Sequence, residues 1–281
     1  MQDLQSITDA WGQWMAKKHN TRCRYTESTN YKRQSSLDQY RDKQVAVTPL
    51  NIVYDSNSLP TSGADVVYSL WYQNDTTEKQ THVFKYAEEH ASSFNWTITE
   101  KLSVGVEVSV SAGVPEVATA SAKTSVNLSL SSTQGATWTE TKTWEVHSPV
   151  LVPANSLVRV EMVINTQSYD INFTESVLLA GNVALWFEDK RELGSSGAHW
   201  LYFFPIQNVF NDVIRNNLAN TRGYQITGGG VLATARGVFQ GKQGISVGVT
   251  ATQMPAPAKG IAAQPRSLSQ VEIYPSPIAA E

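Results

Sequence analysis

Alternating hydrophobic and polar side chains dominate residues 103–131, in the middle of the chain. The even positions from 104 to 130 are apolar apart from Glu116 and Thr124, whereas the odd positions are small or polar apart from Val117. Successive side chains of a β-strand point to opposite faces, so the pattern predicts strands with one apolar face and one polar face. Gly113 and Pro115 are typical turn residues, and they predict that the two strands form a hairpin.

The predicted hairpin has the dimensions of a membrane-spanning unit. Folding about Pro115 sets residues 104–112 beside residues 118–126, and each arm approaches the roughly 9 to 11 residues that a tilted strand needs to cross a bilayer. The same fold places Glu107 opposite Lys123 on the polar face. A single hairpin in lipid would leave its edge amides unpaired, so we expect a closed barrel built from several copies.

Ordinary sandwich strands also alternate, and the small side chains of this segment favour the membrane interpretation over that alternative. The predicted lipid face consists of apolar even positions, namely Val104, Val106, Val108, Val110, Ala112, Val114, Ala118, Ala120, Ala122, Val126 and Leu128. The predicted lumen face consists of Ser103, Glu107, Ser109, Ser111, Thr119, Ser121, Lys123, Ser125 and Asn127. The predicted turn consists of Gly113, Pro115, Glu116 and Val117.

Elsewhere the pattern predicts two amphipathic helices and a series of strands. Apolar residues at spacings of three and four predict helices over 4–15 and 206–218. Strand-like segments separated by turn residues are 45–53, 65–72, 80–99, 157–165, 171–187, 231–239 and 245–250. After Gln253 the chain is rich in proline, alanine and serine, which predicts a tail rather than a strand within a sheet.

Composition and charge narrow the class of protein. Charged residues make up 17% of the chain, below the roughly 25% typical of soluble domains, and β-formers are abundant. A net charge of −3 gives no electrostatic reason to bind nucleic acid. Cys23 is the only cysteine, so an internal disulfide is excluded. Residues 1–20 do not read as a secretory signal, and no apolar run is long enough for a transmembrane helix.

Catalytic motifs are missing from the sequence. The five histidines form no His-Glu-x-x-His pair, and neither a Gly-x-Ser-x-Gly elbow nor a phosphate-binding loop is present. We therefore expect no enzyme activity, cofactor or metal. A non-lytic carbohydrate-binding or adhesive β protein remains the alternative to a pore-forming protein.

Two motifs connect the hairpin to a known family. Residues 111–118 read Ser-Ala-Gly-Val-Pro-Glu-Val-Ala, and residues 135–141 read Gly-Ala-Thr-Trp-Thr-Glu-Thr. They resemble the turn and the following hydroxyl-rich strand of the aerolysin-like β-pore-forming toxins, in the branch of epsilon toxin and the mosquitocidal and other insecticidal toxins. The resemblance extends over about residues 80–250.

The resemblance implies a mainly β, elongated fold with long antiparallel strands and a small α/β head. It implies a head at 1–75 plus 188–228, a long-strand middle module at 76–102 plus 144–187, a tail module at 103–143 plus 229–253, and a C-terminal tail at 254–281. It also implies a bacterial toxin that is secreted or released as a soluble protein, binds a target-cell surface, is activated by proteolysis, oligomerises and inserts a β-barrel. The branch that it resembles implies insecticidal activity.

Partners implied by the resemblance are the target-cell membrane, a glycan, protein or lipid receptor, and further copies of the chain in a ring. The candidate receptor-binding residues are aromatic side chains of the predicted head, namely Tyr31, Tyr40, Trp71, Tyr72, Trp200, Tyr202 and Phe203. Lys259 and Arg266 are candidate sites of activating cleavage in the tail.

Overall fold

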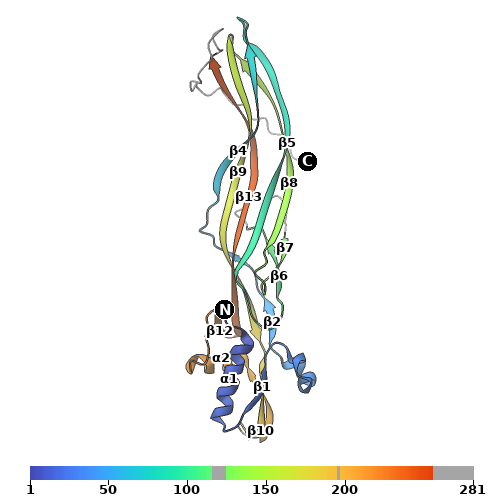
Figure 1. Ribbon diagram of the computed structural model, residues 1–281, viewed down its shortest axis with the longest axis vertical. Helices are drawn as coiled ribbons and strands as arrows, with labels where there is room; N and C mark the ends of the chain where they lie inside the picture. The colour runs from blue at the N-terminus through green and yellow to red at the C-terminus, as the bar shows by residue number, and fades with distance from the viewer. Residues whose placement is uncertain (116–124, 195–196, 256–281) are drawn as a thin grey trace.

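Two long antiparallel strands form the axis of the molecule (Figure 1). β9 (Ser156–Ala180) and β13 (Gly230–Pro255) contain 25 and 26 residues and pair along almost their whole length. At about 3.3 Å per residue, such strands extend for about 80 Å. The computed structural model describes residues 1–115, 125–194 and 197–255.

Six further strands complete an eight-stranded antiparallel sheet, with the order β2-β9-β13-β5-β8. In addition, β12 pairs with β13, and both β3 and β4 pair with β9. The bounds of these strands are β2 (Ala46–Pro49), β3 (Val53–Tyr54), β4 (Thr61–Asn74), β5 (Gln80–Glu100), β8 (Ala136–Val152) and β12 (Tyr224–Thr227). The predicted mainly β class with long antiparallel strands is confirmed.

The buried side of β9 changes along its length. Even residues are buried from Ser156 to Thr166, and odd residues are buried from Tyr169 to Leu179. The alternation of buried and exposed residues therefore changes phase near residues 166–170. This position lies between the two predicted strands, 157–165 and 171–187. Backbone pairing with β13 continues through this region, so the prediction of two separate strands here is wrong. The predicted break between 231–239 and 245–250 is likewise absent from β13.

At the end far from the head, the sheet divides into two layers. β13 pairs with β5 only between Arg236 and Lys242, and beyond this point β4-β9-β13 and β5-β8 are separate. An apolar core that includes Phe84 and Met162 lies between the two layers, and the stacked rings of Tyr68 and Tyr86 lie 3.8 Å apart.

The head contains a three-stranded sheet and two α-helices. Its strands have the order β1-β10-β11, and its elements are α1 (Leu4–Lys18), β1 (Cys23–Glu27), β10 (Asn182–Glu192), β11 (Ala198–Pro205) and α2 (Ile206–Arg215). Gly181 joins β9 to β10 at φ +131°, and an added Cβ would lie 2.4 Å from the carbonyl oxygen of Gln44. Glycine is therefore required where the chain passes from the long sheet into the head.

Both predicted helices are confirmed. The Asp3 side chain caps α1 by accepting a hydrogen bond from Ser6 N, and Lys17 and Lys18 lie in its last turn, where the helix dipole favours cations. Ile7 and Trp11 of α1 are fully buried in the same core as Val209 of α2. The polar stretch that follows β1 contains two 3₁₀ segments, η1 (Tyr31–Arg33) and η2 (Ser35–Lys43).

The sheets do not follow the predicted module boundaries throughout. Residues 46–74, predicted as part of the head, provide β2, β3 and β4 of the eight-stranded sheet. β10 begins at Asn182, within the predicted middle module, and belongs to the head sheet. The prediction assigned residues 46–74 to the head together with the segment that precedes them, whereas β2, β3 and β4 pair with β9, which comes from a distant part of the chain.

Candidate functional site

The alternating segment forms a separate two-stranded sheet beside the head-proximal part of the long strands (Figure 1). β6 (Ser109–Gly113) pairs antiparallel with β7 (Ser125–Ser129). Val110 lies opposite Leu128, and Ser111 lies opposite Asn127. Even residues therefore pair with even residues, and the two faces of the hairpin keep distinct compositions.

The apolar face of this hairpin is turned into the protein. Its buried members are Val104, Val108, Val110, Ala112, Leu128 and Leu130, and Val106, Val114 and Val126 are partly buried against the same core. The polar residues Glu107, Ser109, Ser111, Ser125 and Asn127 are exposed, whereas Ser103 is partly buried. The predicted separation of the two faces is thus present over residues 104–114 and 125–130 in this conformation. The remaining predicted face residues lie outside the described residues, namely Ala118, Thr119, Ala120, Ser121, Ala122 and Lys123.

Aromatic side chains of the long strands lie in the core that the hairpin covers. Phe94, Trp96, Phe173 and Phe239 belong to the same buried cluster as the hairpin valines. Tyr54 of β3 connects the two layers, because its hydroxyl accepts a hydrogen bond from Trp96 Nε1 at 2.8 Å and donates one to the Gly113 carbonyl at 2.5 Å. The carbonyl of β6 is thereby fixed to the sheet.

A second set of hydrogen bonds holds the beginning of the first arm against the head. Leu4 N donates to the Ser103 carbonyl at 2.8 Å, and the Ser103 hydroxyl donates to Asp3 Oδ2 at 2.8 Å. The buried hydroxyl of Thr29 donates to the Val104 carbonyl at 2.6 Å. The N-terminal end of α1 and the loop after β1 therefore retain the hairpin through its main chain.

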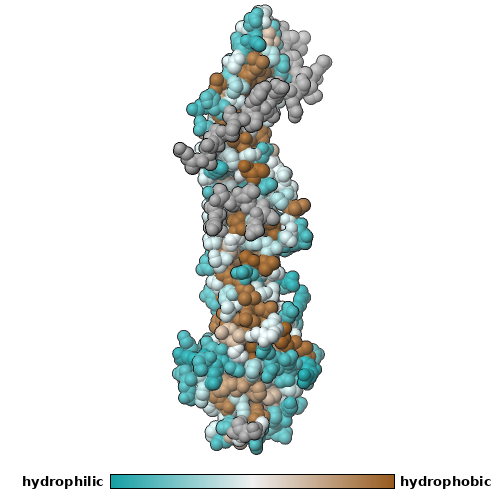
Figure 2. Space-filling model, turned by 180° about the vertical axis from the view of Figure 1, so that it is seen from behind, coloured by the Kyte–Doolittle hydropathy of each residue, from teal (hydrophilic) through white to brown (hydrophobic). Residues whose placement is uncertain are grey.

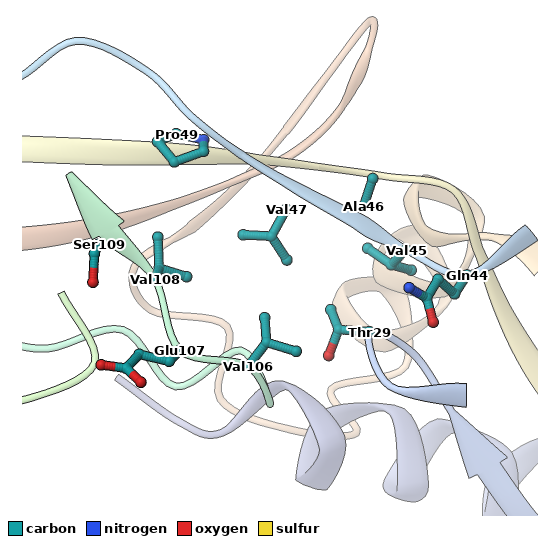
Figure 3. A pocket seen from close by; sticks show the side chains of 10 residues that line it. All are labelled: Thr29, Gln44, Val45, Ala46, Val47, Pro49, Val106, Glu107, Val108 and Ser109. Carbon is teal, nitrogen blue, oxygen red and sulfur yellow. The ribbon is translucent and has the colours of Figure 1, made fainter. Parts of the chain in front are cut away.

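Two hollows flank this first arm. A hollow of about 290 Å³ separates β2 from residues 106–109, and Val47 and Val106 point toward each other across it (Figure 3). A second hollow, of about 420 Å³, is lined by residues 101–107 and by Asp3, Ser129, Ser131 and Ser132. Side chains at such gaps lose part of their dispersion contacts, and Val106, which borders both hollows, is only partly buried. The hydrogen bonds described above therefore add to the apolar packing that holds the first arm.

The register of β6 and β7 corrects the predicted turn. Folding about Pro115 would place Gly113 opposite residue 117, but Gly113 lies in β6 and pairs with Ser125. Each observed pair is centred on residue 119 instead, so the register gives no support for setting Glu107 opposite Lys123. Small side chains alternate on both sides of the predicted turn, and such a pattern specifies the register of a hairpin only weakly. Pro115 is buried, and Glu116 and Val117 lie outside the described residues.

The candidate receptor-binding aromatics do not form one surface. Trp71 and Tyr72 lie on β4, at the end of the molecule far from the head, because β4 pairs with β9 near Leu157. Tyr31 is fully buried in the head and donates a hydrogen bond to the Asn182 carbonyl at 2.7 Å, so it is not available to a receptor. Burial raises the pKa of the Tyr31 phenol above its usual value.

Three of the candidates are partly exposed in the head, and a fourth is exposed there. Tyr40 and Phe203 contact each other at 5.0 Å between ring centroids, and Tyr202 is partly buried. Trp200 is 45% exposed, with Lys190 Nζ 4.3 Å from the centre of its ring. Hydrophilic residues dominate the sides of the head, while hydrophobic residues reach the surface along the middle of the shaft (Figure 2).

Residues for other kinds of chemistry are scattered. Among the residues that the structure describes, no group of three or more His, Cys, Asp or Glu side chains is arranged to hold a metal. None of the described helices has the length and apolarity needed to cross a membrane. Burial raises the pKa of the Cys23 thiol to about 11, so this thiol is a poor nucleophile at neutral pH. Lys259 and Arg266 lie outside the described residues.

Comparison with known sequences identifies relatives along most of the chain. The family described as Clostridium epsilon toxin ETX/Bacillus mosquitocidal toxin MTX2 matches residues 21–257. A protein named Cytotoxin, from Pseudomonas aeruginosa, is 35% identical over 263 residues, which cover 92% of this chain and 91% of the relative.

Solved structures share the fold at lower identity. A non-toxic crystal protein from Bacillus thuringiensis has a TM-score of 0.62 and 13% identity, over 91% of this chain and 98% of the other. The Mpp75Aa1.1 β-pore-forming protein from Brevibacillus laterosporus has a TM-score of 0.58 and 15% identity, over 97% of this chain and 95% of the other. Because one of these two proteins is described as non-toxic, the fold alone does not decide the activity.

Proposed function

The chain belongs to the family of Clostridium epsilon toxin ETX and Bacillus mosquitocidal toxin MTX2, a family of aerolysin-like pore-forming toxins, and we propose that it forms membrane pores by releasing and inserting residues 103–131. In this proposal the protein is secreted or released by a bacterium, binds a target-cell surface, is activated by proteolysis and assembles into a homo-oligomeric ring. Insecticidal activity is proposed from the family branch. Pore formers of this kind are generally not enzymes.

One observation carries the proposal: in the described parts of the hairpin, residues 104–114 and 125–130, one face is apolar and packs on the protein's own core, and the other face is polar. The apolar face is covered by a sheet of its own chain and needs a new apolar environment once it leaves. A bilayer supplies that environment, and the exposed serines then line water. Because a lone hairpin has unpaired edges, several copies must close a barrel.

The observed register also improves the fit to a bilayer. If pairing centred on residue 119 continues in the inserted state, residues 108–118 and 120–130 provide arms of about eleven residues, at the upper end of the range for a tilted transmembrane strand. The even positions of both arms would face lipid and the odd positions the lumen. Glu116 would lie near the end of the hairpin that emerges on the far side.

Receptor recognition is proposed for the exposed and partly exposed aromatics of the head, namely Tyr40, Trp200, Tyr202 and Phe203. Trp71 and Tyr72, at the opposite end, are proposed as a separate contact. The receptor is a glycan, protein or lipid of the target cell. Cleavage at Lys259 or Arg266 is proposed to remove the C-terminal tail, and both positions suit a protease of trypsin specificity.

Dye release provides the test of this function. We expect trypsin-treated protein to release a trapped dye from vesicles made of lipids extracted from a sensitive cell line, and to yield a large ring in detergent. Uncleaved protein serves as the control and should release the dye slowly. If cleaved protein binds the vesicles but gives neither leakage nor a ring, the proposal of a pore is wrong. The non-lytic, glycan-binding alternative then replaces it, and the exposed side chain of Trp200 is the observation that favours that alternative.

A further inference from the structure

One acidic side chain, Glu175, lies on the sheet face that the hairpin covers. Glu175 is in β9 between Phe173 and Val177, whose side chains lie on the same face and belong to the core that contains the hairpin valines. The residue is 1% exposed. Neither of its carboxylate oxygens has a hydrogen-bond partner among the described residues. Buried carboxylates are normally paired, so this group calls for an explanation.

The neighbours of Glu175 offer it little stabilisation as an anion. Ala235 of β13 lies directly across the strand pair, and Tyr54 of β3 pairs with Phe173 two residues away. The Tyr54 hydroxyl already donates its hydrogen bond to the Gly113 carbonyl of the hairpin, so this hydrogen is not available to Glu175. Val110 and Ala112 of the hairpin and Trp96 and Ile98 of β5, which belong to the same core, are uncharged.

We propose that Glu175 couples the retention of the hairpin to pH, so that the hairpin is held when the carboxyl is protonated and is released more readily when the carboxyl ionises. The inference rests on the proposed function, because it supposes that the hairpin moves. Its physical basis is the cost of keeping an unpaired carboxylate in an apolar layer. Release of the hairpin uncovers this face of β9 and returns the carboxylate to water.

The direction of the effect follows from linkage. Burial raises the pKa of Glu175 to about 7, from an ordinary value of 4.5. The nearby backbone N–H of Leu50 opposes this shift only in part, because it donates its hydrogen bond to the Ser176 carbonyl at 2.9 Å and not to the carboxylate. The closed state therefore binds the proton more tightly than the open state, and its advantage is fully present below pH 4.5 and is lost as the pH rises through 7. Tyr54 is a titratable neighbour, and burial, with a smaller contribution from the charge of Glu175, raises the pKa of Tyr54 to about 12, so this phenol stays neutral across the range.

The opening of the hairpin can be measured without a membrane. Ala112→Cys, in a Cys23→Ser background, places a thiol on the buried face of β6, at a position that is 0% exposed. Its labelling rate by a water-soluble reagent, divided at each pH by the rate of the urea-unfolded protein, gives the open fraction. We expect that fraction to rise about thirtyfold between pH 5.5 and pH 8 and to level off above pH 8.

Two substitutions at the same position test the cause. Glu175→Gln and Glu175→Leu are each expected to abolish the pH dependence, whereas Asp170→Asn, at an exposed position of the same strand, is expected to retain it. Hydrogen exchange of the β6 and β7 amides, corrected for intrinsic rates, should give the same result without a cysteine reporter. An unchanged rise with pH in both Glu175 variants would overturn the inference.

The outcome is separable from that of the proposed function. Dye release by the cleaved protein, with an open fraction independent of pH in the wild type, would refute the role of Glu175 and leave pore formation intact. Opening that depends on both pH and Glu175 in a protein that releases no dye would support the role of Glu175 and count against the pore.

Discussion

A disulfide between positions 29 and 105 is expected to reduce dye release to the level of vesicles without protein, and reduction of the disulfide is expected to restore it. The Thr29 hydroxyl bonds the Val104 carbonyl, and a Cβ added at Gly105 would lie 2.8 Å from Thr29 Oγ1. The two positions are therefore close enough for a bridge, whose Cβ atoms lie about 3.5 to 4.5 Å apart. With residue 105 held at the head, the first arm cannot separate from its docking site and extend from β5.

The comparison is made on one protein, Thr29→Cys/Gly105→Cys/Cys23→Ser, in its oxidised and reduced forms. Gly105 has φ +81°, so a cysteine there carries backbone strain, and the reduced form is the reference for that strain. Binding to vesicles should be equal in the two forms, and Thr29→Cys alone should release dye under oxidising conditions. Equal dye release by the oxidised and reduced forms would remove this hairpin from the mechanism.

Replacing Phe239 with alanine is expected to lower the free energy of unfolding by about 3 to 5 kcal/mol. The Phe239 side chain is fully buried, and its ring centroid lies 5.1 Å from that of Trp96 and 5.6 Å from that of Phe94. The substitution leaves a cavity where the long strands meet the layer that the hairpin covers. Urea denaturation followed by tryptophan fluorescence measures the change.

Gln240→Ala provides the matched control, because Gln240 is exposed at the next position of β13. Its effect should stay within about 0.5 kcal/mol. A loss below about 1 kcal/mol for Phe239→Ala would show that the aromatic cluster does not support the junction between the sheet and the hairpin.

The sequence predicted those features that depend on local periodicity. Spacings of three and four identified α1 and α2, and alternation identified the hairpin and the residues of its buried face. The register of the hairpin escaped prediction because small residues alternate on both sides of Pro115, so several registers keep even residues together. Tyr31 is a receptor candidate in the sequence as an aromatic residue of the predicted head, and only the packing of η1 against the head sheet buries it.

Other parts of the site depend on contacts between distant segments. Thr29 and Tyr54 hold the hairpin through hydrogen bonds to the Val104 and Gly113 carbonyls, and neither residue stands out in its own stretch of sequence. Glu175 did carry a signal: it occupies an odd position among Ile171, Phe173 and Val177, where alternation predicts an apolar side chain. A charged residue in phase with a buried face is therefore a feature to examine in related sequences.

The central claim, that the hairpin inserts with its even positions toward lipid, is tested most directly by labelling two cross-strand pairs in the membrane-bound state. In a Cys23→Ser background, an environment-sensitive dye is attached at Val110→Cys or Leu128→Cys, which face each other, and at Ser111→Cys or Asn127→Cys, which face each other on the opposite side. The account predicts quenching by lipid-borne quenchers at 110 and 128, and quenching by aqueous iodide at 111 and 127. The same response to both quenchers at all four positions would contradict it.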